Sequence, residues 1–376
     1  MSSFQRRMEI VQRRMEEAGI GCFLTGPSST MKYLTGYSGK PDERLFVLVM
    51  ASGQKPFVVA NQLYALQASV IPAGDFVYWS DGENGVEVLC RELERRGVDL
   101  SSAAVDKSML GMFLVPLMER LQETKLLLGN SLVDDLRIYK DAEEMDCMMT
   151  ACRLASEALE ETVARGNWWI GKTETEFMGQ LAFEMTKRGL KLPSGIVAVG
   201  ANAAVPHHLT GQTRIEAGNC LLVDFGGNYR NYNTDMTRTI HFGEPSDEFK
   251  RVYEIVLEAN RRGKLAAKAG NQLQDVDRAA RSYIASQGYG PYFTHRTGHG
   301  IGIDGHEGPS AGEGETTLIQ TGMAFSVEPG IYLPGKFGVR IEDQVLITET
   351  GTRVLHDFPR ELMVIKYQEI VADWTR

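Results

Sequence analysis

The chain has 376 residues, of which 43% are hydrophobic and 24% are charged, and its formal net charge at pH 7 is −9. The composition is that of a globular protein, and the length favours two domains over a single hydrophobic core. The negative charge and the lack of a long basic run exclude nucleic acid and an anionic membrane surface as expected partners.

The N-terminal sequence and the cysteines bear on location. MSSFQRRMEIVQRRMEEAG predicts an amphipathic charged helix without the apolar core of a signal peptide. No apolar run is long enough to span a bilayer. The cysteines form no CxxC pair and are odd in number: Cys22, Cys90, Cys147, Cys152 and Cys220. This pattern predicts reduced, buried thiols in a cytoplasmic protein.

Residues 1–135 alternate strand and helix patterns. Short apolar runs bounded by turn residues predict strands at GCFLTG, RLFVLVMAS, KPFVVAN, DFVYWS, AAVDK and KLLLGN. Helical patterns lie between several of these runs, notably GVEVLCRELERRG and GMFLVPLMERLQET. This order predicts a smaller α/β domain over residues 1–135.

The pattern changes near residues 130–140, and residues 136–376 are predicted to form a second domain. Helices are expected at about 141–164, 174–188, 247–268 and 275–286, and Thr173 with Glu176 forms a capping box before the second helix. Strand pairs are expected at 219–225 with 234–241 and at 323–328 with 338–347. Helices that interrupt antiparallel strands favour an α+β fold.

Carboxylates occupy strand positions in the first of these pairs, although Asp is a poor strand former. In LLVDFGG, Leu222, Asp224 and Gly226 share one strand face, and Asp235 lies in the partner strand TDMTRTI. A hairpin can bring both carboxylates onto one side, but the sequence leaves the register open. A half-solvated sheet with a polar outer face is the alternative interpretation of this hairpin.

The second strand pair also carries carboxylates at strand positions. Glu328 ends the apolar strand in AFSVEPGIY, and alternation in GVRIEDQVLIT places Arg340, Glu342 and Gln344 on one face and Asp343 on the other. Four convergent carboxylates would repel one another unless a cation neutralised them. Oxygen-rich surroundings suit hard or borderline divalent ions, so the pattern predicts a metal site.

All seven histidines lie beyond residue 206, which indicates that the chemistry belongs to the second half. In HRTGHGIGIDGHEGP, glycines flank His299 and let backbone pack closely around its imidazole, and His306 follows seven residues later. GHGIG lacks the preceding strand and following helix of a dinucleotide-binding loop, and the HxxH and HExxH zinc spacings are absent. His207 and His208 in NAAVPHH precede the Asp hairpin, and one of them is expected to face the site.

Five elements in this order resemble the pita-bread metallopeptidase family, which includes methionine aminopeptidase, aminopeptidase P, prolidase and creatinase: PHH, D-x10-D, GHGIG followed by HE, VEPGIY and VRIED. The resemblance covers about residues 135–370. The earlier segment, with YLTGYSG, more loosely resembles the N-terminal domain of creatinase, prolidase and aminopeptidase P, which methionine aminopeptidases usually lack. The implied architecture is an α+β pita-bread catalytic domain over residues 136–376, preceded by a creatinase-like α/β domain over residues 1–135.

Carried over position by position, the resemblance implies a two-metal site with five ligands: Asp224, Asp235, His299, Glu328 and Glu342. Creatinase-type relatives lack this ligand set, so a metal-free site is not expected. Two divalent ions are implied as cofactors, with Mn the first expectation and Co, Fe or Zn as alternatives. Glu328, a ligand that also borders the attacking water, is assigned as proton shuttle.

The resemblance also assigns residues around the ligands. His207 and His306 match active-site histidines that hydrogen-bond to the substrate as charge develops. Arg340 and Tyr332 are assigned to substrate binding. Ser310 departs from the pattern, because prolidases that cut dipeptides commonly carry an Arg just after HExP that binds the free carboxylate of the substrate.

The expected function is a metallopeptidase that releases an N-terminal residue from peptides with proline in second position. Ser310 leaves open whether dipeptides or longer peptides are cut. A non-peptidase C–N hydrolase or lyase acting on a small metabolite is the alternative on this scaffold, and a non-catalytic binding protein is a third. The resemblance also implies a homodimer.

Overall fold

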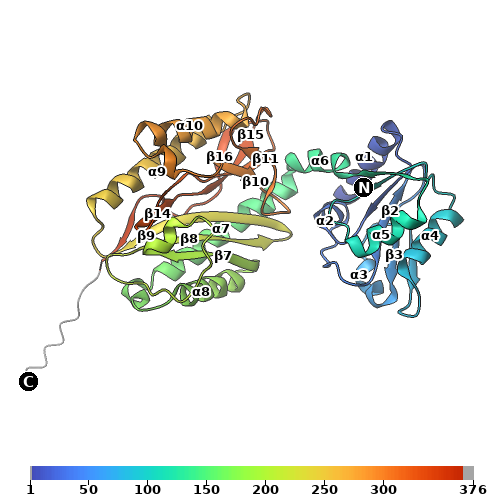
Figure 1. Ribbon diagram of the computed structural model, residues 1–376, viewed down its shortest axis with the longest axis horizontal. Helices are drawn as coiled ribbons and strands as arrows, with labels where there is room; N and C mark the ends of the chain where they lie inside the picture. The colour runs from blue at the N-terminus through green and yellow to red at the C-terminus, as the bar shows by residue number, and fades with distance from the viewer. Residues whose placement is uncertain (1, 367–376) are drawn as a thin grey trace, which may run out of the picture. The chain divides into compact units, whose positions relative to one another are not determined.

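A computed structural model describes residues 2–366 and divides the chain into two compact units, one ending at Arg137 and one beginning at Ile138 (Figure 1). Residues 367–376, which the sequence assigns to the second domain, lie outside the described residues. Within the described part of the chain, none of the helices combines the length and the apolar character that crossing a membrane requires.

The first unit is built on a six-stranded sheet with the order β4-β3-β2-β1-β5-β6. Its strands are β1 (Cys22–Thr25), β2 (Phe46–Ala51), β3 (Phe57–Asn61), β4 (Asp75–Trp79), β5 (Ser102–Val105) and β6 (Lys125–Leu128). Its helices are α1 (Ser3–Glu17), α2 (Ser29–Thr35), α3 (Ala65–Ala68), α4 (Gly85–Arg95) and α5 (Gly111–Arg120), and α6 (Asp134–Ile138) spans the boundary between the units. All six strand runs predicted from the sequence form strands.

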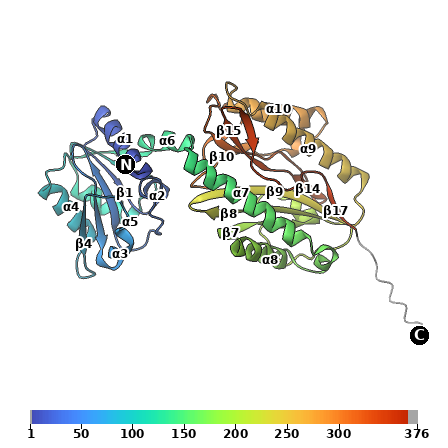
Figure 2. The ribbon, with the colours of Figure 1, turned by 180° about the vertical axis from the view of Figure 1, so that it is seen from behind.

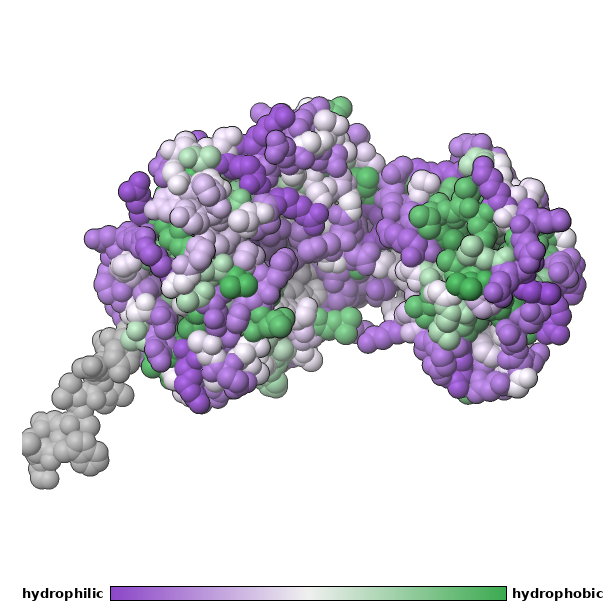
Figure 3. Space-filling view, viewed as in Figure 1, coloured by the Kyte–Doolittle hydropathy of each residue, from purple (hydrophilic) through white to green (hydrophobic). Residues whose placement is uncertain are grey.

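Helix α5 leaves part of its apolar surface uncovered within the first unit. Met112, Val115 and Met118 are spaced three residues apart and are each at least half exposed. Figure 3 shows apolar side chains gathered on this face of the first unit. An exposed apolar area of this kind is typical of an interaction surface.

The second unit contains the four long helices predicted from the sequence: α7 (Ala142–Val163), α8 (Glu174–Lys187), α9 (Asp247–Ala266) and α10 (Leu273–Ser286). The capping box before α8 is confirmed, because the Thr173 side chain accepts from the backbone of Glu176 and the Glu176 side chain accepts from the backbone of Thr173. Satisfying these two N–H groups fixes the start of α8 at Glu174.

The described strands of this unit form three sheets. One has the order β17-β9-β8-β7, a second has the order β11-β10-β12-β15-β16, and a third is the pair β13-β14. Their bounds are β7 (Lys191–Val199), β8 (Cys220–Tyr229), β9 (Tyr232–Phe242), β10 (Gly298–Gly300), β11 (Glu307–Ala311), β12 (Ala324–Val327), β13 (Gly330–Leu333), β14 (Phe337–Arg340), β15 (Asp343–Thr348), β16 (Gly351–Val354) and β17 (Met363–Ile365).

The two faces of strand β8 point into different layers. Val223 and Phe225 pack in one core with α7 and α8, whereas Leu222 packs in another with α9. Figures 1 and 2 show α7 crossing one face of β8 and β9. The alternation predicted from the sequence is confirmed, and Asp224 therefore lies on the face turned away from α7 and α8.

The prediction of one continuous strand over residues 338–347 is wrong. β14 ends at Arg340 and pairs with β13, whereas β15 begins at Asp343 and pairs with β12. Between them the backbone of Ile341 and Glu342 bonds elsewhere: Asn260 donates to the Ile341 carbonyl, and the Glu342 N–H donates to the carbonyl of Thr237 on β9. These non-local bonds break the ladder at the point where Glu342 is presented.

Candidate metal centre

A cavity of about 120 Å³ lies in the second unit, and nearly all of its lining residues are ionisable. Its walls carry four carboxylates, four histidines and two arginines: Asp224, Asp235, Glu328, Glu342, His207, His295, His299, His306, Arg296 and Arg340. A larger open depression of about 960 Å³ beside α1 brings together no comparable set of ligating groups among the described residues. The ionisable cavity is therefore the candidate site.

The carboxylates reach the cavity from strands and strand ends. In the β8–β9 ladder Asp224 is opposite Thr237 and Asp235 is opposite Gly226, so the two carboxylates are diagonal neighbours on one face. Glu328 follows β12, and Glu342 lies in the break between β14 and β15. The structure thus brings together the four carboxylates that the sequence singled out.

Ligating atoms within 4.8 Å of one another form three overlapping groups. These are Asp235 with His299 and His306, His299 with Glu328 and Glu342, and Asp224 with Asp235 and Glu342. Together they contain all five ligands assigned from the sequence, and they add His306, which the sequence assigned to catalysis instead.

His299 is held with its lone pair toward the carboxylates. Its Nδ1 donates to the Gly300 carbonyl at 3.0 Å, so Nε2 is the unprotonated nitrogen. Nε2 lies 3.3 Å from Glu328 Oε1 and 3.8 Å from Asp235 Oδ2. Burial lowers the pKa of His299 to about 4, so the ring stays neutral. A lone pair that faces carboxylates is repelled unless a cation lies between them.

Glycine is required beside His299. A Cβ added to Gly298 would lie 1.9 Å from the Ser326 carbonyl oxygen, and one added to Gly300 would lie 2.8 Å from the Gly308 carbonyl oxygen. Both distances are too short for any side chain. The close backbone packing that the sequence predicted around this imidazole is therefore confirmed.

The carboxylates themselves show that the site fits a cation. Burial and then the charge of Asp224 raise the pKa of Asp235 well above its usual range, and burial and then Asp235 do the same for Glu342. Burial also raises the pKa of Glu328 to about 7. Glu342 Oε2 accepts from Thr237 at 2.7 Å, but its buried Oε1 has no hydrogen-bond partner. A divalent ion would satisfy this oxygen and offset the repulsion.

Arg340 and Tyr332 form one hydrogen-bonded chain with the centre. Arg340 Nη2 donates to Asp224 Oδ2 at 2.6 Å, and Nη1 donates to the Tyr332 hydroxyl at 2.8 Å. The hydroxyl must then donate its own hydrogen to His295 Nε2 at 2.7 Å, and His295 Nδ1 donates to the Arg296 carbonyl. Burial raises the pKa of Tyr332 to about 12 and lowers that of His295 to about 4, which keeps both groups neutral. Tyr332, which the sequence assigns to substrate binding, is buried, is not among the residues that line the cavity, and is hydrogen-bonded to Arg340.

The adjacent histidines His207 and His208 lie in different surroundings. His207 lines the cavity, whereas His208 Nε2 lies 2.9 Å from Glu174 Oε2. Glu174 is the first residue of α8 and its side chain is fully buried. It also accepts three hydrogen bonds of 2.8 Å, from the amides of Val199 and Gly211 and from the Asn202 side chain. The segment that carries His207 is therefore fastened to α8, a role for Glu174 that the sequence did not indicate.

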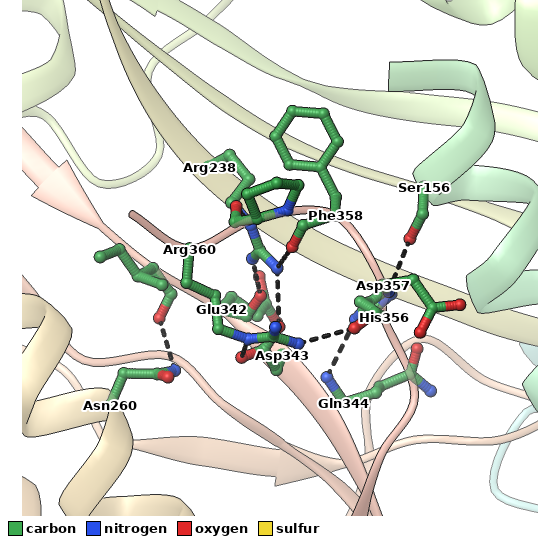
Figure 4. Close-up of polar contacts among 12 residues, drawn as sticks. Ser156, Arg238, Asn260, Glu342, Asp343, Gln344, His356, Asp357, Phe358 and Arg360 are labelled. Carbon is green, nitrogen blue, oxygen red and sulfur yellow. Dashed lines mark hydrogen bonds and ion pairs between the residues drawn. The ribbon is translucent and has the colours of Figure 1, made fainter. Parts of the chain in front are cut away.

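A buried ionic cluster lies directly beside Glu342 (Figure 4). Asp343 accepts from Arg238 at 2.8 Å, from Lys264 at 2.6 Å and from Arg360 at 2.7 Å. Burial alone would raise the pKa of Asp343, but these three cations hold it well below its usual range. Arg238 also donates to the Glu342 carbonyl. Asp343 thus points away from the cavity, as alternation predicted, and its cluster fixes the backbone of the neighbouring ligand.

Asn260 on α9 also holds the backbone of the centre. Its side-chain amide donates to the Val327 carbonyl at 2.8 Å and to the Ile341 carbonyl at 3.1 Å. Val327 and Ile341 immediately precede Glu328 and Glu342, so one buried amide joins the backbone segments of two candidate ligands. No pattern in the sequence indicated a role for this residue.

The profile of metallopeptidase family M24 matches residues 146–349. The chain belongs to this family. The profile of the creatinase/prolidase N-terminal domain matches residues 7–139 of this M24 metallopeptidase. Its relatives include the Xaa-Pro dipeptidase of Pyrococcus horikoshii, 35% identical over 366 residues, which are 96% of this chain and 100% of that protein.

Solved structures agree with this assignment. The prolidase of Thermococcus sibiricus has a TM-score of 0.92 at 33% identity and covers 97% of this chain and 99% of its own. The X-Pro aminopeptidase of Thermotoga maritima has a TM-score of 0.81 at 32% identity and covers 94% and 100%. The predicted resemblance and the predicted fold class, a creatinase-like α/β domain followed by an α+β pita-bread domain, are confirmed. The protein is a metallopeptidase, and its family implies divalent metal ions.

Proposed function

We propose that this M24 metallopeptidase uses two divalent ions to release the N-terminal residue of peptides with proline in second position. The observation that carries the two-ion proposal is the overlap of the ligand groups. Glu342 belongs to two groups, one with His299 and Glu328 and one with Asp224 and Asp235, so it can serve two neighbouring ions. These two groups together contain the five proposed ligands.

Oxygen donors with one imidazole suit Mn first, with Co, Fe or Zn as alternatives. When bound by these residues, two such ions would supply an activated water molecule and polarise the scissile carbonyl. Glu328 is the group of this chain that would take up the proton of that water and deliver it to the leaving nitrogen, because its carboxylate lies in the cavity among the ligating groups.

The histidines of the cavity would hold the substrate. His207 and His306 both line the cavity and can donate N–H groups to the substrate carbonyl or to the proline side of the scissile bond. Arg340, assigned to substrate binding from the sequence, has its guanidinium engaged by Asp224 and Tyr332. Its proposed role is therefore to hold Asp224 in place.

The Xaa-Pro preference is supported by relatives named Xaa-Pro dipeptidase, prolidase and X-Pro aminopeptidase. A cytoplasmic location is proposed because all five cysteines are free and buried, as expected in a reducing compartment.

A homodimer is proposed with the exposed apolar face of α5 as a candidate contact, and sedimentation of the wild type and of Val115→Lys tests it.

The function is tested with the metal-loaded protein on Xaa-Pro dipeptides, Xaa-Pro-Yaa tripeptides and matched Xaa-Ala peptides. Cleavage of the proline peptides that depends on Mn or Co and stops with a chelator is the expected result. Asp235→Ala should lose this activity and keep its fold by circular dichroism. Full activity after removal of metal would refute the metal-dependent mechanism, and metal-loaded protein that cuts none of these peptides would favour a non-peptidase reaction.

A further inference from the structure

Two arginines line the cavity, and they differ in how many hydrogen bonds their guanidinium groups make within the protein. Arg340 is buried, and its guanidinium donates to Asp224, Tyr332 and Thr237. Arg296 is exposed, and its side chain makes one hydrogen bond, from Nη1 to the Ser310 hydroxyl at 2.7 Å. No carboxylate of the described residues forms an ion pair with it. Arg296 is therefore the cavity cation with donors available to a ligand.

The bond to Ser310 places this guanidinium beside the metal centre. Ser310 on β11 is the register partner of His299 on β10, and directly opposed residues of antiparallel strands project to the same face. The hydroxyl therefore lies on the His299 side of the sheet. Gly312 leaves room for the arginine, because a Cβ there would lie 3.2 Å from the Cβ of Arg296.

We propose that Arg296 binds the free C-terminal carboxylate of the substrate and that Ser310 holds the guanidinium in place for it. The proposal rests on the proposed peptidase function and narrows its substrate class to Xaa-Pro dipeptides. The flat fork of a guanidinium matches a carboxylate with two parallel hydrogen bonds. A carboxylate that approaches a cavity with four carboxylates on its walls also needs a local positive charge.

The position of Arg296 would also select the length of the substrate peptide. One additional residue moves the terminal carboxylate by about 3.3–3.6 Å, beyond the reach of hydrogen bonds from an arginine fixed at one point. Arg296 would thus distinguish dipeptides from tripeptides without any change at the metal centre.

The test compares one Xaa-Pro dipeptide with its C-terminal carboxamide, using Mn-loaded wild type and Arg296→Gln. The variant should lower kcat/KM for the free carboxylate about 10- to 100-fold, mainly through KM, and change the carboxamide less than about threefold. Arg278→Gln, which removes an exposed arginine of α10 outside the cavity, should leave both substrates unchanged. Equal losses on both substrates, or no loss on the dipeptide, would overturn the proposal.

Two variants at Ser310, one of which moves the positive charge from position 296 to position 310, give a stricter test. Ser310→Ala should lower dipeptide kcat/KM about 3- to 10-fold with no change for the carboxamide, because the guanidinium loses its anchor but keeps its charge. The double variant Arg296→Gln/Ser310→Arg should recover at least about tenfold over Arg296→Gln on the dipeptide alone. Recovery on both substrates, or on neither, would contradict carboxylate recognition at this point of the cavity.

A binding measurement separates this proposal from the peptidase proposal. Calorimetric titration with proline and with prolinamide should show at least about tenfold tighter binding of proline to the wild type and no preference in Arg296→Gln. If the wild type cuts no Xaa-Pro peptide but shows this preference, the function fails and the carboxylate site stands. If it cuts dipeptides but binds both probes equally, the carboxylate site fails and the function stands.

Discussion

Replacing Asn260 with Ala should loosen two proposed metal ligands that the Asn260 side chain does not contact. Its amide is fully buried and donates to the carbonyls of Val327 and Ile341. Each lost bond removes about 1 kcal/mol, and each carbonyl left buried without a donor costs about 1–3 kcal/mol. Removing the unpaired Asn260 Oδ1 offsets part of this loss. The free energy of unfolding should therefore fall by about 2–5 kcal/mol.

The same change should weaken metal binding, because the two carbonyls precede Glu328 and Glu342. Loss of a group that orients a ligand typically lowers metal affinity about 10- to 100-fold. Urea denaturation followed by circular dichroism measures the first effect, and calorimetric titration of the metal-free protein with Mn measures the second. Ser246→Ala is the matched control, since it removes the N-cap of the same helix far from the cavity and should cost about 1 kcal/mol without weakening Mn binding. Unchanged Mn affinity in a destabilised Asn260→Ala would refute the reasoning.

Three further changes test the rest of the site. Metal-free Asp235→Asn should melt higher than the metal-free wild type, by about 2–4 °C for each kcal/mol of repulsion removed, and Mn should no longer raise its Tm. Glu174→Gln should lower kcat about 10- to 100-fold through misplacement of His207 while Mn affinity by calorimetry stays unchanged. His356 is neutral when folded, with a pKa lowered by burial to about 3, so protonation of the unfolded chain below about pH 6.5 destabilises the fold. Denaturation at pH 7.5 and 5.0 should therefore show the wild type losing about 2 kcal/mol more than His356→Gln, and parallel losses would contradict this pKa.

The features that the sequence predicted correctly depend on patterns among neighbouring residues. The alternation that set Asp224 and Leu222 apart from Val223 was readable because the side-chain period of a strand does not depend on its partner. The four helices were readable from their apolar period and the capping box at Thr173. Four of the five proposed ligands stood out because Asp and Glu at strand positions contradict both strand propensity and apolar pattern, and His299 stood out by its flanking glycines.

What the sequence did not predict depends on distant partners. β7 was missed because KLPSGIVAV contains Pro and Gly and its first half is mostly exposed, so pairing with β8 defines it. β10 has three residues, two of them glycines, and exists only through its neighbours. The strand break at Ile341 depends on Asn260, 81 residues earlier, and the choice of His207 over His208 depends on Glu174. No local pattern encodes such contacts, because each is decided only when two remote segments meet.

The charges around the centre explain how the fold can present its ligands before any cation arrives. Four carboxylates converge on the cavity, and one arginine, Arg340, forms an ion pair with one of them, Asp224. Behind Glu342, three cations pair with the carboxylate of Asp343. One of them, Arg238, also donates to the Glu342 carbonyl, so this cluster holds the backbone of Glu342 without occupying the side-chain oxygens that face the cavity. The unpaired Glu342 Oε1 is what remains for a metal ion, and a ligand set held ready in this way loses little conformational freedom when an ion binds.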